Sequence, residues 1–253
     1  MPKSDLAFAK PLMNAAGTLG FAPDFRSPIA WQDLGAFITN PISWHRRSPA
    51  EGPALLEYPG GFLLHPGLPN PGFADVMQHY RRRWQQSLLP IIVHIMADRP
   101  EETGRMVQAL EGEDNVMGVE LGFAPLLADD IILLALEMSR GELPLIVCLP
   151  HEQVLRLGPR VLREGAAAIS LAAPRGSLVR DGEEVSGRLF GASLFPAALG
   201  LVRSASKAGL PIIGAGGVFA ADAVQAMLAA GAMAIQLDAQ LWLPGEKEKS
   251  LVN

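Results

Sequence analysis

Five side chains that can bind metals or transfer protons stand at or just after the ends of short apolar runs. They are His94, Glu120, Cys148, His151 and Asp238. Such residues brought together could hold a metal ion or carry out acid–base chemistry. Their spacing matches no metal signature of the His-x-x-His kind, so they could equally be hydrogen-bonded residues that fill a polar pocket. We take the first four as candidate catalytic residues and predict no metal ligand.

A glycine-rich corner forms a second candidate site. Gly214, Gly216 and Gly217 follow the apolar run 211–213 and precede a helical pattern at 220–230. Backbone N–H groups that converge at the start of a helix can hold a phosphate. The alternative is a tight strand-to-helix turn that binds nothing, and a glycine cluster alone does not separate the two.

Apolar strands alternate with helices along the chain. The strands are predicted at 11–15, 34–39, 90–95, 116–121, 143–149, 166–171, 211–213 and 234–237. The helices are predicted at 75–87, 100–110, 128–140, 152–164, 195–208 and 220–230. This alternation predicts an α/β protein, a single (β/α)8 TIM barrel domain over 1–253, with its chemistry at the carboxyl ends of the strands. A doubly wound open sheet is the alternative.

Three segments are predicted to lack regular structure. Residues 48–72 are rich in Pro and Gly, and 174–190 are polar. Long loops of this kind inside a compact domain are usually functional. The charged tail 244–250 is expected to fray.

The composition narrows the class of protein. Hydrophobic residues make up 49% of the chain and charged residues 19%, which suits strands buried on both faces. A net charge of -5 gives no basic surface for nucleic acid. The one cysteine excludes an intrachain disulfide framework, and no apolar run has the length of a membrane span. We expect a cytoplasmic protein with a small-molecule ligand and without nucleic-acid or membrane partners.

Several segments, in order along the chain, resemble the dihydroorotate dehydrogenase family of FMN-binding barrels. They are 11–20 (PLMNAAGTLG), 57–63 with 67–72 (EYPGGFL, GLPNPG), 190–199 (FGASLFPAAL) and the glycine corner. The resemblance implies an FMN site at Ala16, Gly17, Asn40, Cys148, Gly191, Gly214, Gly216, Gly217 and Asp238. It implies substrate contacts at Leu64 and Asn70.

The residues that oxidise the family's substrate are largely absent. In the family a Cys or Ser base follows strand four, whereas 120–127 here reads ELGFAPLL, without hydroxyl, thiol or amide side chains. The family's substrate asparagines fall on Leu64, Gly122 and Ala173, and only Asn70 is kept. Leu and Ala cannot replace an amide that both donates and accepts hydrogen bonds. We therefore predict that dihydroorotate oxidation is lost.

The cofactor positions also differ. The resemblance places two lysines, which stabilise the reduced flavin, at Asn40 and Cys148, and a phosphate-binding glycine at Asp238. A carboxylate about 4 Å from a phosphate charge would cost about 4 kcal/mol at an effective dielectric constant near 20. We therefore predict FMN binding that is weakened or lost.

Three functions stay open. We favour a barrel that has lost its redox chemistry and serves as a binding or assembly protein. The alternative is an FMN-dependent oxidoreductase with a changed substrate, and a weaker one is a lyase or hydrolase, metal-assisted or acid–base, using His94, Glu120 and Asp238. The resemblance implies a homodimer, or assembly with another protein. The sequence does not identify the ligand.

Overall fold

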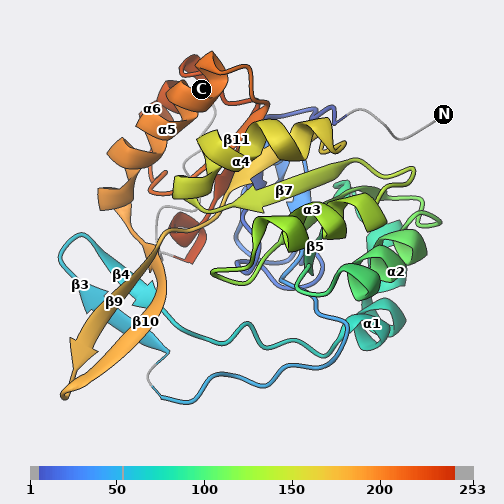
Figure 1. The fold of residues 1–253 in the computed structure, drawn as a ribbon, viewed down its shortest axis with the longest axis horizontal. Helices are drawn as coiled ribbons and strands as arrows, with labels where there is room; N and C mark the ends of the chain where they lie inside the picture. Colours follow the sequence, from blue (N-terminus) through green and yellow to red (C-terminus); the bar gives the residue numbers. More distant parts are fainter. Residues whose placement is uncertain (1–5, 53, 243–253) are drawn as a thin grey trace.

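Eight parallel strands form a barrel in the computed structural model, which describes residues 6–52 and 54–242 (Figure 1). The predicted tail 244–250 lies outside the described residues. The strand order is β1-β12-β11-β8-β7-β6-β5-β2. The strands are β1 (Leu12–Asn14), β2 (Phe37–Ile38), β5 (Ile91–Met96), β6 (Val116–Gly122), β7 (Leu145–Leu149), β8 (Ala168–Leu171), β11 (Ile212–Ala215) and β12 (Ala234–Leu237). The predicted α/β barrel is confirmed.

A side chain helps to close the barrel between β1 and β2. The backbone contributes a parallel bridge between Met13 and Ala36. Next to it, the amide of Asn14 donates to the carbonyl of Ile38 at 2.7 Å and accepts from the N–H of Ile38 at 2.9 Å. The Asn14 amide thus takes the place of a peptide group and extends a ladder that the two-residue β2 could not form alone.

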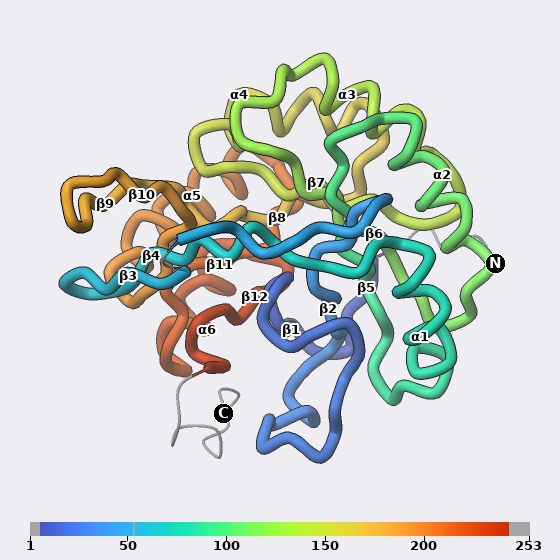
Figure 2. Tube along the Cα trace, turned by 90° about the horizontal axis from the view of Figure 1, so that it is seen from below, coloured from blue at the N-terminus to red at the C-terminus, as the bar shows by residue number. Residues whose placement is uncertain are grey.

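Helices cover the outside of the barrel (Figure 2). The α-helices in the described residues are α1 (Phe73–Gln85), α2 (Pro100–Leu110), α3 (Asp129–Met138), α4 (His151–Arg163), α5 (Phe195–Lys207) and α6 (Ala221–Ala229). Each predicted helix is present, with ends shifted by up to two residues. The β1–β2 connection carries only the 3-10 turn η1 (Trp31–Asp33), and β12 is followed by the 3-10 turn η3 (Ala239–Trp242).

The core has two parts. The larger one lies between strands and helices and includes Trp84, Phe37 and Leu110, all at most 1% exposed. The smaller one fills the barrel interior with Met13, Ala36, Ile38, Ile92, Ile146, Ala168, Ile213 and Ala234. Side chains alternate across a strand, so the residues two positions further along also point inward. On β5, β8 and β12 those residues are polar, and they form the floor of the barrel mouth.

An accessory antiparallel sheet corrects the prediction for the two long loops. Its order is β3-β4-β10-β9, with β3 (Leu55–Tyr58), β4 (Gly61–Leu64), β9 (Arg175–Arg180) and β10 (Glu183–Phe190). Both 48–72 and 174–190 were expected to be irregular, and each instead contributes a hairpin. Each hairpin gains its stability from the other, because β4 pairs with β10 across more than a hundred residues.

Candidate functional site

Glu120 stands at the centre of the barrel mouth. Its carboxylate accepts hydrogen bonds from His94 Nδ1 at 2.6 Å, from Ser170 Oγ at 2.6 Å and from Gln236 Nε2 at 2.5 Å. These donors come from β5, β8 and β12, so the carboxylate connects strands on opposite sides of the barrel. The side chain of Glu120 is 1% exposed. We call these four residues the mouth floor.

The mouth floor keeps Glu120 ionised although it is buried. Burial raises the pKa of this carboxyl, but the hydrogen bond and the charge of His94, followed by the Ser170 and Gln236 bonds, outweigh it. The pKa of Glu120 therefore lies below its ordinary value. Sequence reasoning singled out His94 and Glu120. It missed the roles of Ser170 and Gln236, although each interrupts an apolar strand.

His94 occupies the space above Gly122. A Cβ atom on Gly122 would lie 2.3 Å from His94 Nε2, so a side chain at position 122 and this His94 rotamer exclude each other. Position 122 is one where the resemblance places a substrate asparagine. His94 thus replaces an amide at the mouth with an imidazole that is held by Glu120 and is itself 7% exposed at its side chain.

Cys148 lies on β7 beside the mouth floor, in register with Gly122 and Ser170. Burial raises the pKa of its thiol to about 12, and the charge of Glu120 adds to that rise. Ser170 and Arg188 oppose it with smaller effects. The thiol is therefore protonated at neutral pH, which does not favour a role as nucleophile.

His151 is separate from the mouth-floor hydrogen bonds. It begins α4, just after β7. Burial lowers its pKa, with a smaller opposing effect from Glu152, so the ring is neutral at neutral pH. Its Nε2 atom is buried without a hydrogen-bond partner in the described part of the chain.

Within residues 6–52 and 54–242, no group of three or more His, Cys, Asp or Glu side chains is arranged to hold a metal ion. His94 and Glu120 form a pair without a third donor. A metal-assisted reaction gains no support from these residues. The acid–base version of the third hypothesis keeps the His94–Glu120 pair.

The glycine corner carries unpaired donors. Gly216 and Gly217 are buried and have φ values of +103° and +72°. Gly217 packs closely on the start of α5, where a Cβ would come within 2.5 Å of the Phe195 nitrogen. No described residue accepts a hydrogen bond from either glycine N–H. Buried backbone donors are nearly always paired, so two adjacent ones beside a helix N-terminus suit an anion such as a phosphate.

The side chain of Asp238 accepts a hydrogen bond from the backbone of the next residue. Its Oδ1 accepts from the N–H of Ala239 at 2.5 Å and its carbonyl accepts from Leu241 at 3.1 Å, so it caps η3. Burial raises the pKa of this carboxyl to about 6, with the backbone hydrogen bonds opposing. The carboxylate is thus engaged locally, and with a pKa of about 6 it is mostly ionised at neutral pH.

The predicted ring side of the flavin site is a tight turn after β1. Asn40 Oδ1 accepts from the N–H of Gly20 at 3.1 Å, and the Asn40 N–H donates to the Gly20 carbonyl at 2.8 Å. Ala16 and Gly17 lie in the turn so held, and both are partly exposed. Asn40 is therefore used to shape the turn and brings no charge to it.

Gly191 directly follows β10, and Leu64 is the last residue of β4; both belong to the predicted site. A Cβ on Gly191 would come within 2.3 Å of the Gly60 carbonyl oxygen, so this position requires glycine for packing. Leu64 lies opposite Arg188 in the β4–β10 ladder. Arg188 is a cation that the sequence reasoning missed, because its hairpin was taken for a loop.

Asn70, the retained substrate position, holds its own loop together. Its Oδ1 accepts from the N–H of Gly72 at 3.0 Å and from both the N–H and the hydroxyl of Ser43. Its Nδ2 donates to the Leu68 carbonyl at 3.2 Å. Most of the hydrogen-bonding capacity of this amide is used inside the protein.

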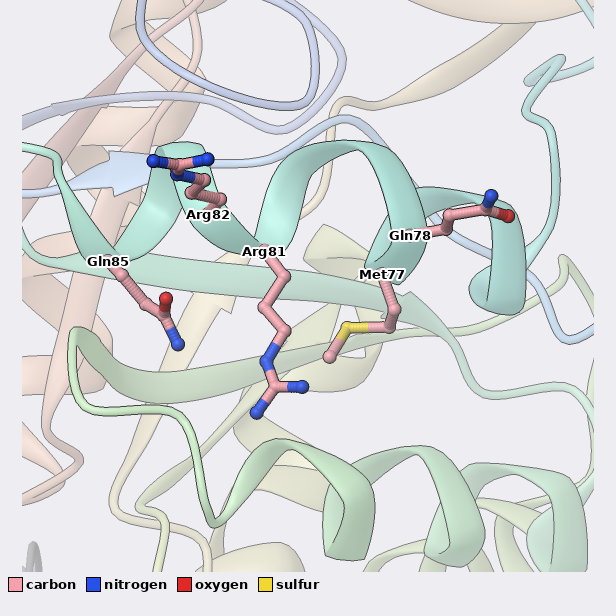
Figure 3. A pocket seen from close by; sticks show the side chains of 5 residues that line it. All are labelled: Met77, Gln78, Arg81, Arg82 and Gln85. Carbon is pink, nitrogen blue, oxygen red and sulfur yellow. The ribbon is translucent and has the colours of Figure 1, made fainter.

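A surface hollow on α1 is unrelated to the mouth. It is lined by Met77, Gln78, Arg81, Arg82 and Gln85, and Figure 3 shows Met77, Arg81 and Gln85 turned to the same side of the helix. Arg81 is paired with Glu113 at 2.8 Å. Arg81 thus forms an ion pair with a buried carboxylate. No described helix is both long and apolar enough to cross a membrane.

A (β/α)8 barrel with a polar floor and a glycine corner at the carboxyl ends of its strands defines a class of proteins that bind small molecules at that end. Residues 3–122 match the family model described as dihydroorotate dehydrogenase. The match ends at Gly122, the last residue of β6.

Relatives that align with more than nine-tenths of the chain share the name dihydroorotate dehydrogenase with the matching family model. The chain is 29% identical to the dihydroorotate dehydrogenase B (NAD(+)) catalytic subunit of Geotalea daltonii, covering 92% of this chain and 84% of that protein. It is 28% identical to the protein of the same name from Desulforudis audaxviator, covering 95% and 86%. It is 27% identical to that from Pelobacter propionicus, covering 92% and 84%. Both comparisons thus find similarity to dihydroorotate dehydrogenases.

Proposed function

We propose that this chain is an FMN-dependent oxidoreductase of the dihydroorotate dehydrogenase type that acts on a changed substrate, with 1–253 forming one domain. The observation that carries the proposal is the pair of buried N–H groups of Gly216 and Gly217, which have no acceptor among the described residues. A phosphate bound there would satisfy both donors and lie beside the start of α5. FMN, when bound, supplies hydride transfer at its ring.

Two features that argued against FMN from sequence are weaker in the folded protein. The carboxylate of Asp238 accepts a hydrogen bond from the N–H of Ala239 and is engaged there. The lost lysine charges are offset in part by Arg188, whose charge reaches Cys148. The residues that would hold the cofactor are Gly216 and Gly217 for its phosphate, with the turn at Ala16 and Gly17 for its ring.

The substrate differs from dihydroorotate in this proposal. The loop between β6 and α3 carries no hydroxyl, thiol or amide, and its Leu126 is fully exposed. His94, held by Glu120, is then the proton-transferring group that stands over Gly122. The relatives are named catalytic subunits, which supports assembly of this chain with another protein.

The test is visible absorption of the purified protein after incubation with FMN and gel filtration. We expect stoichiometric flavin in the wild type and its loss in Gly216→Val. Gly182→Val is the matched control, because Gly182 also has a positive φ, of 84°, but lies at the tip of the β9–β10 hairpin with open space around it. A colourless wild type, or equal flavin in folded Gly216→Val, would rule out the proposal.

A second candidate is a binding or assembly protein without redox chemistry. The observation in its favour is the β6–α3 loop, which offers no group to remove a proton from a substrate held as in the family. The same spectrum separates the two candidates. A folded protein that takes up no FMN supports the second, and turnover that tracks stoichiometric flavin excludes it.

A further inference from the structure

Two arginines face each other in the accessory sheet. Arg188 of β10 is in direct register with Arg175 of β9 on one side and with Leu64 of β4 on the other. Residues in direct register project from the same face of a sheet, and like charges placed opposite each other destabilise it. The fold therefore holds two positive charges together at a cost.

Neither arginine has a partner that would offset this cost. Within residues 6–52 and 54–242, no carboxylate forms an ion pair with Arg188 or Arg175, and neither guanidinium donates a hydrogen bond to a described residue. Arg188 is partly buried, whereas Arg175 is exposed. Burial lowers the pKa of Arg188, as does Arg175, with Cys148 opposing. An arginine nevertheless keeps its proton, so the charge remains.

Arg188 reaches the mouth of the barrel. Its charge acts on the thiol of Cys148, near the end of β7, and Cys148 is in register with Ser170 of the mouth floor. Glu120 is the acidic side chain of the floor, and three donors already occupy it. The floor thus offers Arg188 no free carboxylate, and no other acidic side chain in residues 6–52 and 54–242 forms an ion pair with it.

We propose that Arg188, assisted by Arg175, binds the carboxylate of a small organic acid that enters the mouth above Cys148. A guanidinium presents two parallel N–H groups that match a planar carboxylate, and such charge-assisted pairs are strong when water is excluded. This inference deepens the proposed function by naming a substrate class. It rests on that function only in taking the mouth as the ligand site.

Cys148 provides a direct test because it is the chain's one cysteine. Iodoacetate and iodoacetamide alkylate a thiol by the same step: a sulfur–carbon bond forms, iodide leaves and the thiol proton passes to solvent. The two reagents differ chiefly in that one carries a carboxylate and the other a neutral amide. An anion site beside Cys148 should make iodoacetate the faster reagent.

The measured quantity is the ratio of the two alkylation rates, followed by mass spectrometry at one fixed alkaline pH. We expect the ratio for Cys148 to exceed that for β-mercaptoethanol about tenfold, equivalent to about 1.4 kcal/mol. Arg188→Gln should lower it to the β-mercaptoethanol value. Arg188→Lys, which keeps the charge without the two-pronged geometry, should keep part of it.

Two results would overturn the proposal. One is an equal ratio in the wild type and folded Arg188→Gln. The other is a wild-type ratio no higher than that of β-mercaptoethanol. The flavin content of each sample is read from its visible absorption. A sample without flavin that still prefers iodoacetate would refute the proposed function and leave the carboxylate site standing.

Discussion

Glu120 and Arg188 are both charged and both at the barrel mouth, yet Glu120 is fully buried, Arg188 only partly, and their surroundings differ. Glu120 has three hydrogen-bond donors, contributed by three strands of the barrel. Arg188 stands on the accessory sheet opposite a second arginine and has no described counter-charge. We call the Arg188 and Arg175 side of the mouth the rim.

The difference separates a structural polar group from one suited to a ligand. Burying a charge costs free energy unless partners surround it, and a complete set of partners makes the group part of the framework. The mouth floor meets this condition without a ligand. The rim, within the described residues, does not, so a bound anion would supply a counter-charge there. Three substitutions test this contrast, beginning with the largest expected effect.

Removing the carboxylate of Glu120 should strongly destabilise the protein. Glu120→Ala leaves His94, Ser170 and Gln236 buried without their acceptor, and we expect a loss of about 3–5 kcal/mol in the free energy of unfolding. Urea denaturation measures it. Glu120→Gln, which keeps the shape and one acceptor oxygen, should lose less.

Glu164→Ala is the control for this prediction. Glu164 is paired with Arg140 at 2.6 Å on the exposed surface, and removal of such a pair costs about 0–1 kcal/mol. Should Glu120→Ala lose no more than Glu164→Ala, the mouth floor would not be a structural unit and the contrast with the rim would fail.

The same contrast explains what sequence could predict. The barrel follows from local patterns: apolar runs and helical spacing repeat along the chain, and each pattern needs only its own residues. Residues 55–64 could not be recognised as strands in this way. Pro and Gly surround them, and they become strands only by pairing with β10, which is distant in sequence.

The candidate site was likewise predictable only where its residues lie in locally encoded strands. His94 and Glu120 could be placed at the mouth because each lies in a recognisable strand. Ser170 and Gln236 gave a usable signal, since each is a polar residue inside an apolar strand, at a position where alternation points inward. Arg188 gave none, because its position depends on the unrecognised hairpin. The two hydrogen bonds of Asn14 to Ile38 are likewise a tertiary feature that no local pattern encodes.

Asp238 is a buried carboxylate without the partners that Glu120 has. The pH dependence that it gives to stability should therefore have the opposite sign to that given by Glu120. Burial raises its pKa from 3.8 to about 6 in the folded protein. Between those values the folded state binds more protons than the unfolded state, so stability from this group falls as pH rises through about 4 to 6. Two pH units correspond to about 3 kcal/mol.

Asp238→Asn isolates this effect, because Asn is neutral and still caps η3. We expect the variant to be more stable than the wild type by about 2–3 kcal/mol at neutral pH, with the gain shrinking as pH falls from about 6 and gone below about 4. Glu120, whose pKa is lowered, contributes the opposite dependence to both proteins and cancels in the difference. A difference that does not change with pH would show that burial of Asp238 is not the cause.

The smallest expected effect tests the rim itself. Arg175→Gln removes one of two like charges in direct register, and we expect the free energy of unfolding to rise by about 0.2–1 kcal/mol. The gain should vanish when Arg188→Gln is already present, because the repulsion needs both charges. Chemical denaturation of the four proteins of this cycle measures the coupling.

Arg180→Gln is the matched control in the same hairpin. Arg180 is in register with Glu183, so its removal breaks a favourable pair and should lower stability where Arg175→Gln raises it. A drop for both variants would mean that Arg175 and Arg188 do not repel each other. The rim would then hold no repulsion for an anion to relieve, and the reason for expecting an anion there would be lost. Opposite signs, with the Arg175 gain abolished by a carboxylate ligand, would show that the fold tolerates this repulsion because a bound acid relieves it.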